Sequence, residues 1–288
     1  MPVVQKQRVV KKPTKKARRK RVMSVLDRIE PLNVDGYVKA NFYGRSGTGK
    51  TTLWSTFPSP ILAMLCSGGK RPGELKSINT PENRERIKQV RIEKSSDLTE
   101  LVEHQESTGE FKTVVLDHAT DFQQLVLKEI LGVDRLPEQS SWGLATRNQY
   151  GQVGLQVKER LRGLLDLNCH IVIVAQERDF NNDDNDDDGI ITPFVASAMS
   201  PSIVGWLNSA CDYICETYIR PKMITKKVKL GKKVREKQVP GKGVEYCLRV
   251  APSSVYTTKF RMPKGKSYPD AIVDPNFAKI KSLIDKGV

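Results

Sequence analysis

One segment, Gly44-Arg45-Ser46-Gly47-Thr48-Gly49-Lys50-Thr51, constrains this chain more than any other, because it fits the pattern G-x-x-x-x-G-K-[ST]. The strand-like run Val38–Tyr43 precedes it, and a helix is predicted from about Lys50 to Phe57. Glycines in such a loop allow backbone N–H groups to surround a phosphate, and the start of the helix adds a positive dipole end. The sequence therefore predicts a loop that binds the phosphates of a nucleoside triphosphate.

The residue types in and after this loop predict individual roles. The Lys50 ammonium is expected to reach the β- and γ-phosphates, and the Thr51 hydroxyl to hold Mg²⁺. Asp117 closes the apolar run Lys112–Asp117, and an acid at such a strand end is expected to hold the same Mg²⁺. The guanine-binding pattern [NT]-K-x-D is absent near any predicted strand end, which disfavours a GTPase. The expected nucleotide-binding residues are Gly44, Arg45, Ser46, Gly47, Thr48, Gly49, Lys50, Thr51 and Thr52.

Short apolar runs alternate with helical patterns along the chain, which predicts a mainly parallel sheet flanked by helices. The predicted strands of this part are Ile61–Cys66, a weak one at Val90–Ile92, Lys112–Asp117 and His170–Ala175. The predicted helices lie at about 97–106, 119–131, 144–166 and 201–209. Further strands are expected at 211–220, 246–250 and 255–260, with a closing helix at 276–285.

The positive charge is concentrated in two segments. Of the net charge of +15, residues 1–22 carry +10 and residues 220–243 carry +9, so the remainder is slightly acidic. The second segment reads as a β-hairpin, Met223–Leu230 and Val234–Val239 around Gly231-Lys232-Lys233. Two basic segments on an acidic body favour a polyanion partner such as nucleic acid. The expected DNA-binding residues are Lys226, Lys227, Lys229, Lys232, Lys233, Arg235 and Lys237.

Other classes of site and location are disfavoured. No apolar run approaches the ~20 residues needed to span a bilayer, and no apolar segment follows the first charges as in a secretory signal. Five cysteines without a Cys-x-x-Cys pair indicate reduced thiols in a cytoplasm. The acidic stretch 181–190 begins like a calcium loop but has Val195 where a bidentate Glu is needed. No metal beyond Mg²⁺ is therefore expected. Residues 11–22, KKPTKKARRKRV, also match a nuclear address if the host is eukaryotic.

Several ordered motifs together resemble a known family, the RecA-like recombinase-core ATPases, and in particular their short phage-encoded single-strand annealing proteins. The resemblance spans about residues 36–288. It rests on Gly44–Thr51, Val114–Asp117, Ala175-Gln176-Glu177, "VGWLNSACDYI" (204–214) and Thr258-Lys259-Phe260-Arg261. It implies a RecA-like P-loop NTPase core with C-terminal antiparallel strands. The domain is expected to cover 23–288, including the basic hairpin at about 220–243, after a basic tail of 1–22.

The resemblance also implies roles for catalytic residues. Gln176 is the implied γ-phosphate sensor, and Lys259 with Arg261 would reach the nucleotide of a neighbouring subunit. The family places a catalytic glutamate just after the second strand, where Glu74 is the nearest candidate here and Glu177 the other. The family's DNA-contacting loop follows Gln176, but here this loop is acidic, so DNA binding is expected at the hairpin and tail instead.

These observations predict an oligomeric, Mg²⁺-dependent ATPase, a ring or filament, that acts on single-stranded DNA in recombination or strand annealing. The resemblance also allows a single-strand-binding protein as a partner. Two alternatives remain. The first is a nucleic-acid motor, a helicase or translocase, built on the same core. The second is an annealing scaffold in which ATP binding gates assembly with little turnover.

Overall fold

The computed structural model describes residues 36–66, 74–134, 136, 145–180, 194–230 and 233–287, with the side chains of 226–230, 233–238 and 240 excluded. The compact unit begins at Tyr37. The basic tail 1–22, the stretch 23–35 that the sequence assigned to the domain, and the acidic loop 181–188 lie outside the described residues.

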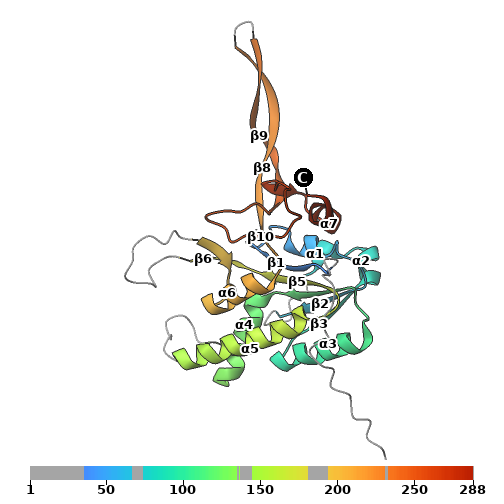
Figure 1. The fold of residues 1–288 in the computed structure, drawn as a ribbon, viewed down its shortest axis with the longest axis vertical. Coiled ribbons are helices and arrows are strands. Elements are labelled where there is room, and N and C mark those ends of the chain that lie inside the picture. The colour runs from blue at the N-terminus through green and yellow to red at the C-terminus, as the bar shows by residue number, and fades with distance from the viewer. Residues whose placement is uncertain are drawn as a thin grey trace, which may run out of the picture. The chain divides into compact units, whose positions relative to one another are not determined.

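The core is one large sheet with strand order β11-β9-β8-β1-β5-β4-β2-β3, and β10 also pairs with β8 (Figure 1). The pairs among β1, β2, β3, β4, β5 and the start of β8 are parallel, and β9, β10 and β11 add antiparallel pairs. The strands are β1 Lys39–Tyr43, β2 Ile61–Leu65, β3 Ile87–Arg91, β4 Thr113–Asp117, β5 His170–Ala175, β8 Tyr213–Leu230, β9 Lys233–Arg249, β10 Lys259–Phe260 and β11 Ala271–Val273. The architecture expected of a RecA-like P-loop core is confirmed.

Helices cover both faces of the sheet, because its central strands are apolar on both sides. On one face pack α3 Ser95–Thr108, α4 Ala119–Leu131, α5 Arg147–Leu165 and α6 Pro201–Ala210. On the other pack α1 Lys50–Trp54 and α7 Phe277–Lys286. In β1, Phe42 faces the α1 side and Tyr43 the opposite side, as the two-residue period of a strand requires.

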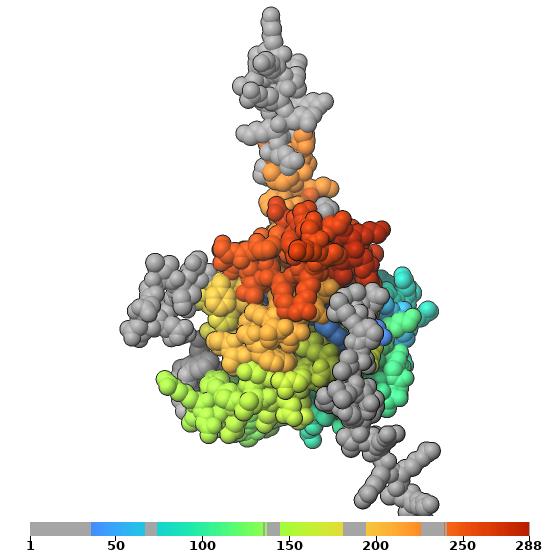
Figure 2. All heavy atoms as spheres, viewed as in Figure 1, coloured from blue at the N-terminus to red at the C-terminus, as the bar shows by residue number. Residues whose placement is uncertain are grey.

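Strands β8 and β9 form a long two-stranded ribbon that extends away from the rest of the sheet (Figures 1 and 2). Its inner part, from Glu216 paired with Arg249, belongs to the sheet, and a register shift between Pro221 and Met223 precedes the outer part. The predicted hairpin is therefore confirmed. The separate strand predicted at 246–250 is wrong, since these residues, up to Arg249, continue the same strand β9.

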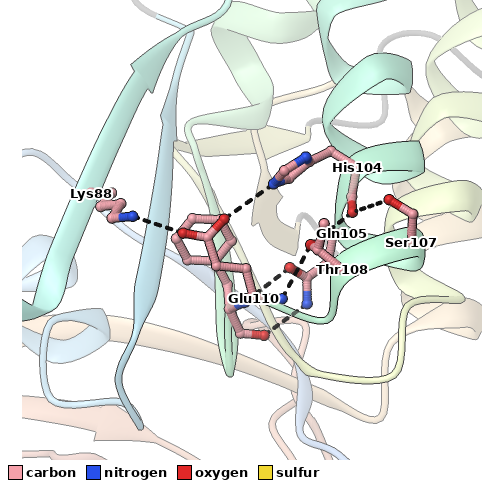
Figure 3. Close-up of polar contacts among 7 residues, drawn as sticks. Lys88, His104, Gln105, Ser107, Thr108 and Glu110 are labelled. Atoms are coloured by element: carbon pink, nitrogen blue, oxygen red, sulfur yellow. Dashed lines mark hydrogen bonds and ion pairs between the residues drawn. The ribbon is translucent and has the colours of Figure 1, made fainter.

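The connection from α3 to β4 is held by side-chain hydrogen bonds (Figure 3). The Gln105 amide bridges the backbone of Phe111, donating to its carbonyl at 2.8 Å and accepting from its N–H at 3.0 Å. Glu110 pairs with Lys88 and with His104. This connection lies at the amino end of β4, whereas Asp117 stands at the carboxyl end.

Other differences from the sequence prediction are local. Helix α1 ends at Trp54 rather than Phe57, and of the strand predicted at 255–260 only Lys259–Phe260 is a strand. Five short elements were not predicted, because each has too few residues to show a clear periodic pattern. They are the 3₁₀ turn η2 Lys76–Ile78, helix α2 Pro81–Arg86, the hairpin of β6 Glu177–Phe180 with β7 Phe194–Ser197, and β11.

Candidate nucleotide-binding site

The glycine-rich loop runs from the end of β1 into α1, with three glycines in conformations that L side chains avoid. Gly44, Gly47 and Gly49 have φ of +152°, +82° and +90°. A Cβ on Gly44 would lie 2.3 Å from the carbonyl oxygen of Thr217 on β8, so only glycine fits there. Gly49 is the left-handed N-cap of α1. Because of these glycines the chain turns sharply after the carboxyl end of β1, and α1 begins there.

Lys50 is buried at the start of α1. Its ammonium donates to the carbonyls of Gly44 and Arg45, each at 2.6 Å, so it spans the loop from inside. Burial lowers the pKa of Lys50 to about 8, against the opposing effect of nearby Asp117. A phosphate placed in the loop would offer this ammonium a stronger, charged acceptor.

Asp117 ends β4, separated from β1 by β5, which brings its carboxylate beside the loop. One carboxylate oxygen accepts from Trp54 Nε1 on α1 at 3.0 Å. Burial raises the pKa of the Asp117 carboxyl above its usual value, while the bond from Trp54 lowers it. A cation would favour the ionised carboxylate at this position.

The donor set fits Mg²⁺. Asp117 and Thr51 both line the same cavity and supply the carboxylate and hydroxyl oxygens that this ion takes alongside phosphate and water. Among the described residues, no group of three or more His, Cys, Asp or Glu is placed to hold a metal alone. The site therefore fits a magnesium ion that arrives with its nucleotide.

The cavity beside the loop measures about 1010 Å³ and gathers most of the predicted site residues. Its lining includes Ser46 to Leu53 of the loop and α1, together with Asp117, Gln176 and Glu74. Sequence reasoning missed six further lining residues, Leu53, Ser77, His118, Tyr246, Asp274 and Pro275. Leu53 and His118 adjoin residues that the sequence did assign. The other four lie in segments without a nucleotide-binding motif, so only the tertiary structure identifies them.

The two candidate glutamates differ in their surroundings. Glu74 lines the cavity, with its carboxylate 3.8 Å from Arg91 at the end of β3. Glu177 begins β6 and pairs with the exposed Arg45 at 2.7 Å. Arg45 thus points out of the loop toward β6, and Glu74 is the glutamate with access to the cavity.

Gln176 stands between β5 and β6 with its backbone held on both sides. Its N–H donates to the Thr120 hydroxyl of α4 at 3.2 Å, and its carbonyl accepts from Ala198 N–H at 2.7 Å. Because the backbone is held and the residue lines the cavity, the amide can reach a terminal phosphate only by side-chain rotation.

Lys259 and Arg261 lie away from this cavity, on and just after β10. The Lys259 ammonium donates to three carbonyls at the end of α6, those of Asn208, Ser209 and Cys211, at 2.7–3.2 Å. Arg261 is largely exposed and pairs with Asp212 at 2.7 Å. Lys259 thus caps α6 within its own chain, and a role for either residue at a neighbour's nucleotide stays a prediction.

The side chains of the predicted DNA-binding residues fall outside the described part of the structure. These are Lys226, Lys227, Lys229, Lys232, Lys233, Arg235 and Lys237, of which Lys232 lies outside the described backbone too. The register of the ribbon nevertheless places Lys226 opposite Lys237 and Val228 opposite Arg235.

In the part of the chain that the structure describes, no helix is long and apolar enough to cross a membrane.

Comparison with known proteins identifies a family. The model of family AAA_24, described as an AAA domain, matches residues 37–262. No curated protein matches the chain. Among solved structures, the chain is similar to the flagellar accessory protein FlaH from Methanocaldococcus jannaschii, with 10% identity and a TM-score of 0.40 over 83% of this chain and 87% of that one.

Proposed function

Because this chain belongs to the AAA_24 family of AAA domains, we propose that it hydrolyses ATP with Mg²⁺, as an oligomer that acts on single-stranded DNA in strand annealing or recombination. The observation that carries the ATPase part is the cavity in which Lys50, Asp117, Glu74 and Gln176 meet. Nucleotide hydrolysis needs a phosphate cradle, a magnesium ligand, a group to orient water and a contact for the transferred phosphoryl group.

Hydrolysis would proceed by attack of a water oxygen on the γ-phosphorus as the bond to the bridging oxygen breaks. Glu74 is the group that would orient this water and accept its proton, because it is the cavity-lining glutamate. Lys50 and Gln176 would bind the oxygens of the transferred group, where charge develops. When bound, Mg²⁺ held through Thr51 and Asp117 would neutralise part of the negative charge of the phosphates.

The ribbon supports the proposed action on DNA. It extends away from the sheet, so both of its edges can meet a long polyanion (Figure 1). Seven Lys or Arg between 226 and 237 stand against one acid, Glu236. Phosphate contacts of this kind bind any sequence and release counterions, as an annealing protein requires.

Arg261 supports the proposed oligomer. It is exposed, lies away from the cavity of its own chain, and among the described residues forms an ion pair with Asp212 alone. An arginine in such a position can contact the nucleotide of a neighbouring subunit without rearranging its own core. ATP bound between subunits would then stabilise a ring or filament.

Steady-state ATP hydrolysis with and without single-stranded DNA tests this proposal. We expect Mg²⁺-dependent turnover that DNA stimulates, together with annealing of complementary strands. Turnover that drives displacement of a paired strand would instead indicate a motor. Annealing that needs ATP but persists without turnover, as in a Glu74→Gln variant, would indicate a scaffold gated by binding.

The location of DNA binding is tested separately by a salt series. Neutralising Lys227, Lys229, Lys232 and Lys233 should weaken binding to every single-stranded sequence alike. It should also lower the salt slope by roughly 0.7 for each lost phosphate contact. Removal of residues 1–22 should have a smaller effect of the same kind. If neutralising the aspartates of 181–188 alters the slope and the ribbon variant does not, DNA binds beside the acidic loop instead.

A further inference from the structure

The nucleotide cavity continues beyond the residues that a triphosphate and Mg²⁺ would use. On that side its wall is formed by Tyr246 of β9 and by Asp274 and Pro275, in the turn between β11 and α7. None of the three belongs to a phosphate-binding motif. A cavity of about 1010 Å³ has room for a whole nucleotide, so this wall is where the base of the nucleotide would lie.

Tyr246 presents an aromatic ring at this wall. The ring lies against the glycine-rich loop, since a Cβ on Gly49 would be 3.2 Å from its Cδ1 atom. At the same time the residue is 43% exposed, so the described residues cover only part of the ring. The ring therefore offers a free face at the mouth of the cavity, next to the start of α1.

Asp274 is held beside Tyr246 by backbone contacts. Its N–H donates to the Tyr246 carbonyl at 2.8 Å, and its own carbonyl accepts from Lys279 Nζ at 3.0 Å. Its φ of +46° is in the left-handed region, which a residue other than glycine adopts only when its surroundings require it. Asp274 is exposed, and its carboxylate forms no salt bridge with another described residue.

We propose that Tyr246 and Asp274 bind the base of the nucleotide, an inference that rests on the proposed ATPase function. The tyrosine ring stacks on the purine, and the carboxylate, which can only accept hydrogen bonds, takes one from the exocyclic amine of adenine. A base that lacks this amine leaves the carboxylate without a donor, so the pair also selects among purines. The end of the ribbon nearest the sheet is thereby part of the nucleotide site.

Equilibrium binding in the presence of Mg²⁺ tests the proposal with three probes: ATP, purine riboside triphosphate, which lacks the amine, and inorganic tripolyphosphate, which lacks the base. Tyr246→Ala should weaken ATP by about 10-fold and leave tripolyphosphate unchanged, because stacking on an aromatic ring carries about that much affinity. Tyr246→Phe should bind as the wild type does. Ile219→Ala, which alters the residue opposite Tyr246 in the ribbon, is the matched control.

Asp274→Gly keeps the backbone conformation, because glycine adopts a left-handed φ freely, and it removes the acceptor altogether. It should bring ATP and purine riboside triphosphate toward equal affinity, whereas Asp270→Gly, at an exposed aspartate nearby, should preserve the wild-type preference for ATP. Equal loss of ATP and tripolyphosphate in Tyr246→Ala would overturn the proposal, since it would mean that the ring only supports the loop. A wild-type protein that binds none of the three probes would refute the ATPase function itself.

Discussion

The Thr48 hydroxyl of the glycine-rich loop lies 2.7 Å from the Thr217 hydroxyl at the base of the ribbon. Thr217 also donates to the carbonyl of Tyr43, the last residue of β1. Both threonines are buried, so this hydrogen bond is shielded from water. The loop that would hold the phosphates and the ribbon that would hold DNA are therefore joined by a direct contact.

Thr217→Val should weaken ATP binding several-fold although Thr217 does not line the cavity. The change keeps the shape of the side chain and removes this hydrogen bond, at a cost of about 0.5–1.5 kcal/mol, while the Thr48 hydroxyl keeps its bond to the Arg45 carbonyl at 2.8 Å. Nucleotide titration of the purified variant measures the effect. Thr225→Val makes the same chemical change at an exposed ribbon position and should be neutral.

The same contact predicts reciprocal coupling. If DNA on the ribbon raises ATP affinity by some factor, ATP must raise DNA affinity by the same factor. In Thr217→Val both factors should shrink together. Equality of the two factors checks that both titrations reached equilibrium, and factors unchanged by the substitution would assign the coupling to other residues.

Affinity for ATP should depend on pH through Lys50. Its pKa is lowered to about 8 by burial, and bound phosphates would raise it again. Binding therefore takes up a proton above pH 8. The affinity is fully present below pH 8 and should fall by up to about tenfold per pH unit above it. Calorimetry in two buffers of different ionisation heat would measure the uptake. Lys50→Ala should keep the fold, bind ATP weakly and show no such dependence.

Asp117→Asn should spare much of the nucleotide binding and lower Mg²⁺-dependent turnover by about two orders of magnitude. The amide oxygen can still accept from Trp54 Nε1, so the fold should persist. An amide is, however, a poor ligand for Mg²⁺. Turnover measured over a magnesium series should remain low at every concentration. Asp134→Asn, at an exposed site, is the matched control, and undiminished turnover in Asp117→Asn would assign the metal to another acid.

Lys259 and Arg261 should respond differently to substitution. Lys259→Met removes the ammonium from the carbonyl end of α6 and should reduce the free energy of unfolding by about 1–2 kcal/mol. Arg261→Ala breaks only an exposed pair and should leave stability nearly unchanged. Mixed with wild-type protein, however, it should lower ATPase activity more than dilution does. A linear mixing curve, like that expected for Lys264→Ala, would argue against action on a neighbour.

Gln105→Leu should destabilise the protein by about 1–3 kcal/mol, because it leaves the buried N–H and carbonyl of Phe111 without partners (Figure 3). Urea unfolding measures the change. Gln152→Leu replaces an exposed glutamine on α5 and should shift the midpoint little. ATPase activity of the folded fraction should be unaffected, since this connection lies at the far end of β4 from Asp117.

Local sequence patterns were sufficient for much of this fold. The period-two and apolar runs of β1, β2, β4 and β5 indicated buried strands, and the glycine pattern indicated the loop between β1 and α1. Short elements such as α2, β6 and β11 escaped prediction, because three to six residues carry too little periodicity to outweigh their context. The extent of β9 escaped it too, since its glycines and Pro240 suggested an end where the strand continues.

The sequence by itself determined the phosphate-binding loop and the acid that faces it, because each is specified by residue types at fixed spacing or at a strand end. Only the tertiary structure decided that Glu74 rather than Glu177 lines the cavity, that Lys259 caps α6, and that Tyr246 and Asp274 complete the wall. These contacts join residues far apart in the chain. They depend on β8 pairing with β1 and carrying β9 and β11 beyond it, an order that no local pattern encodes.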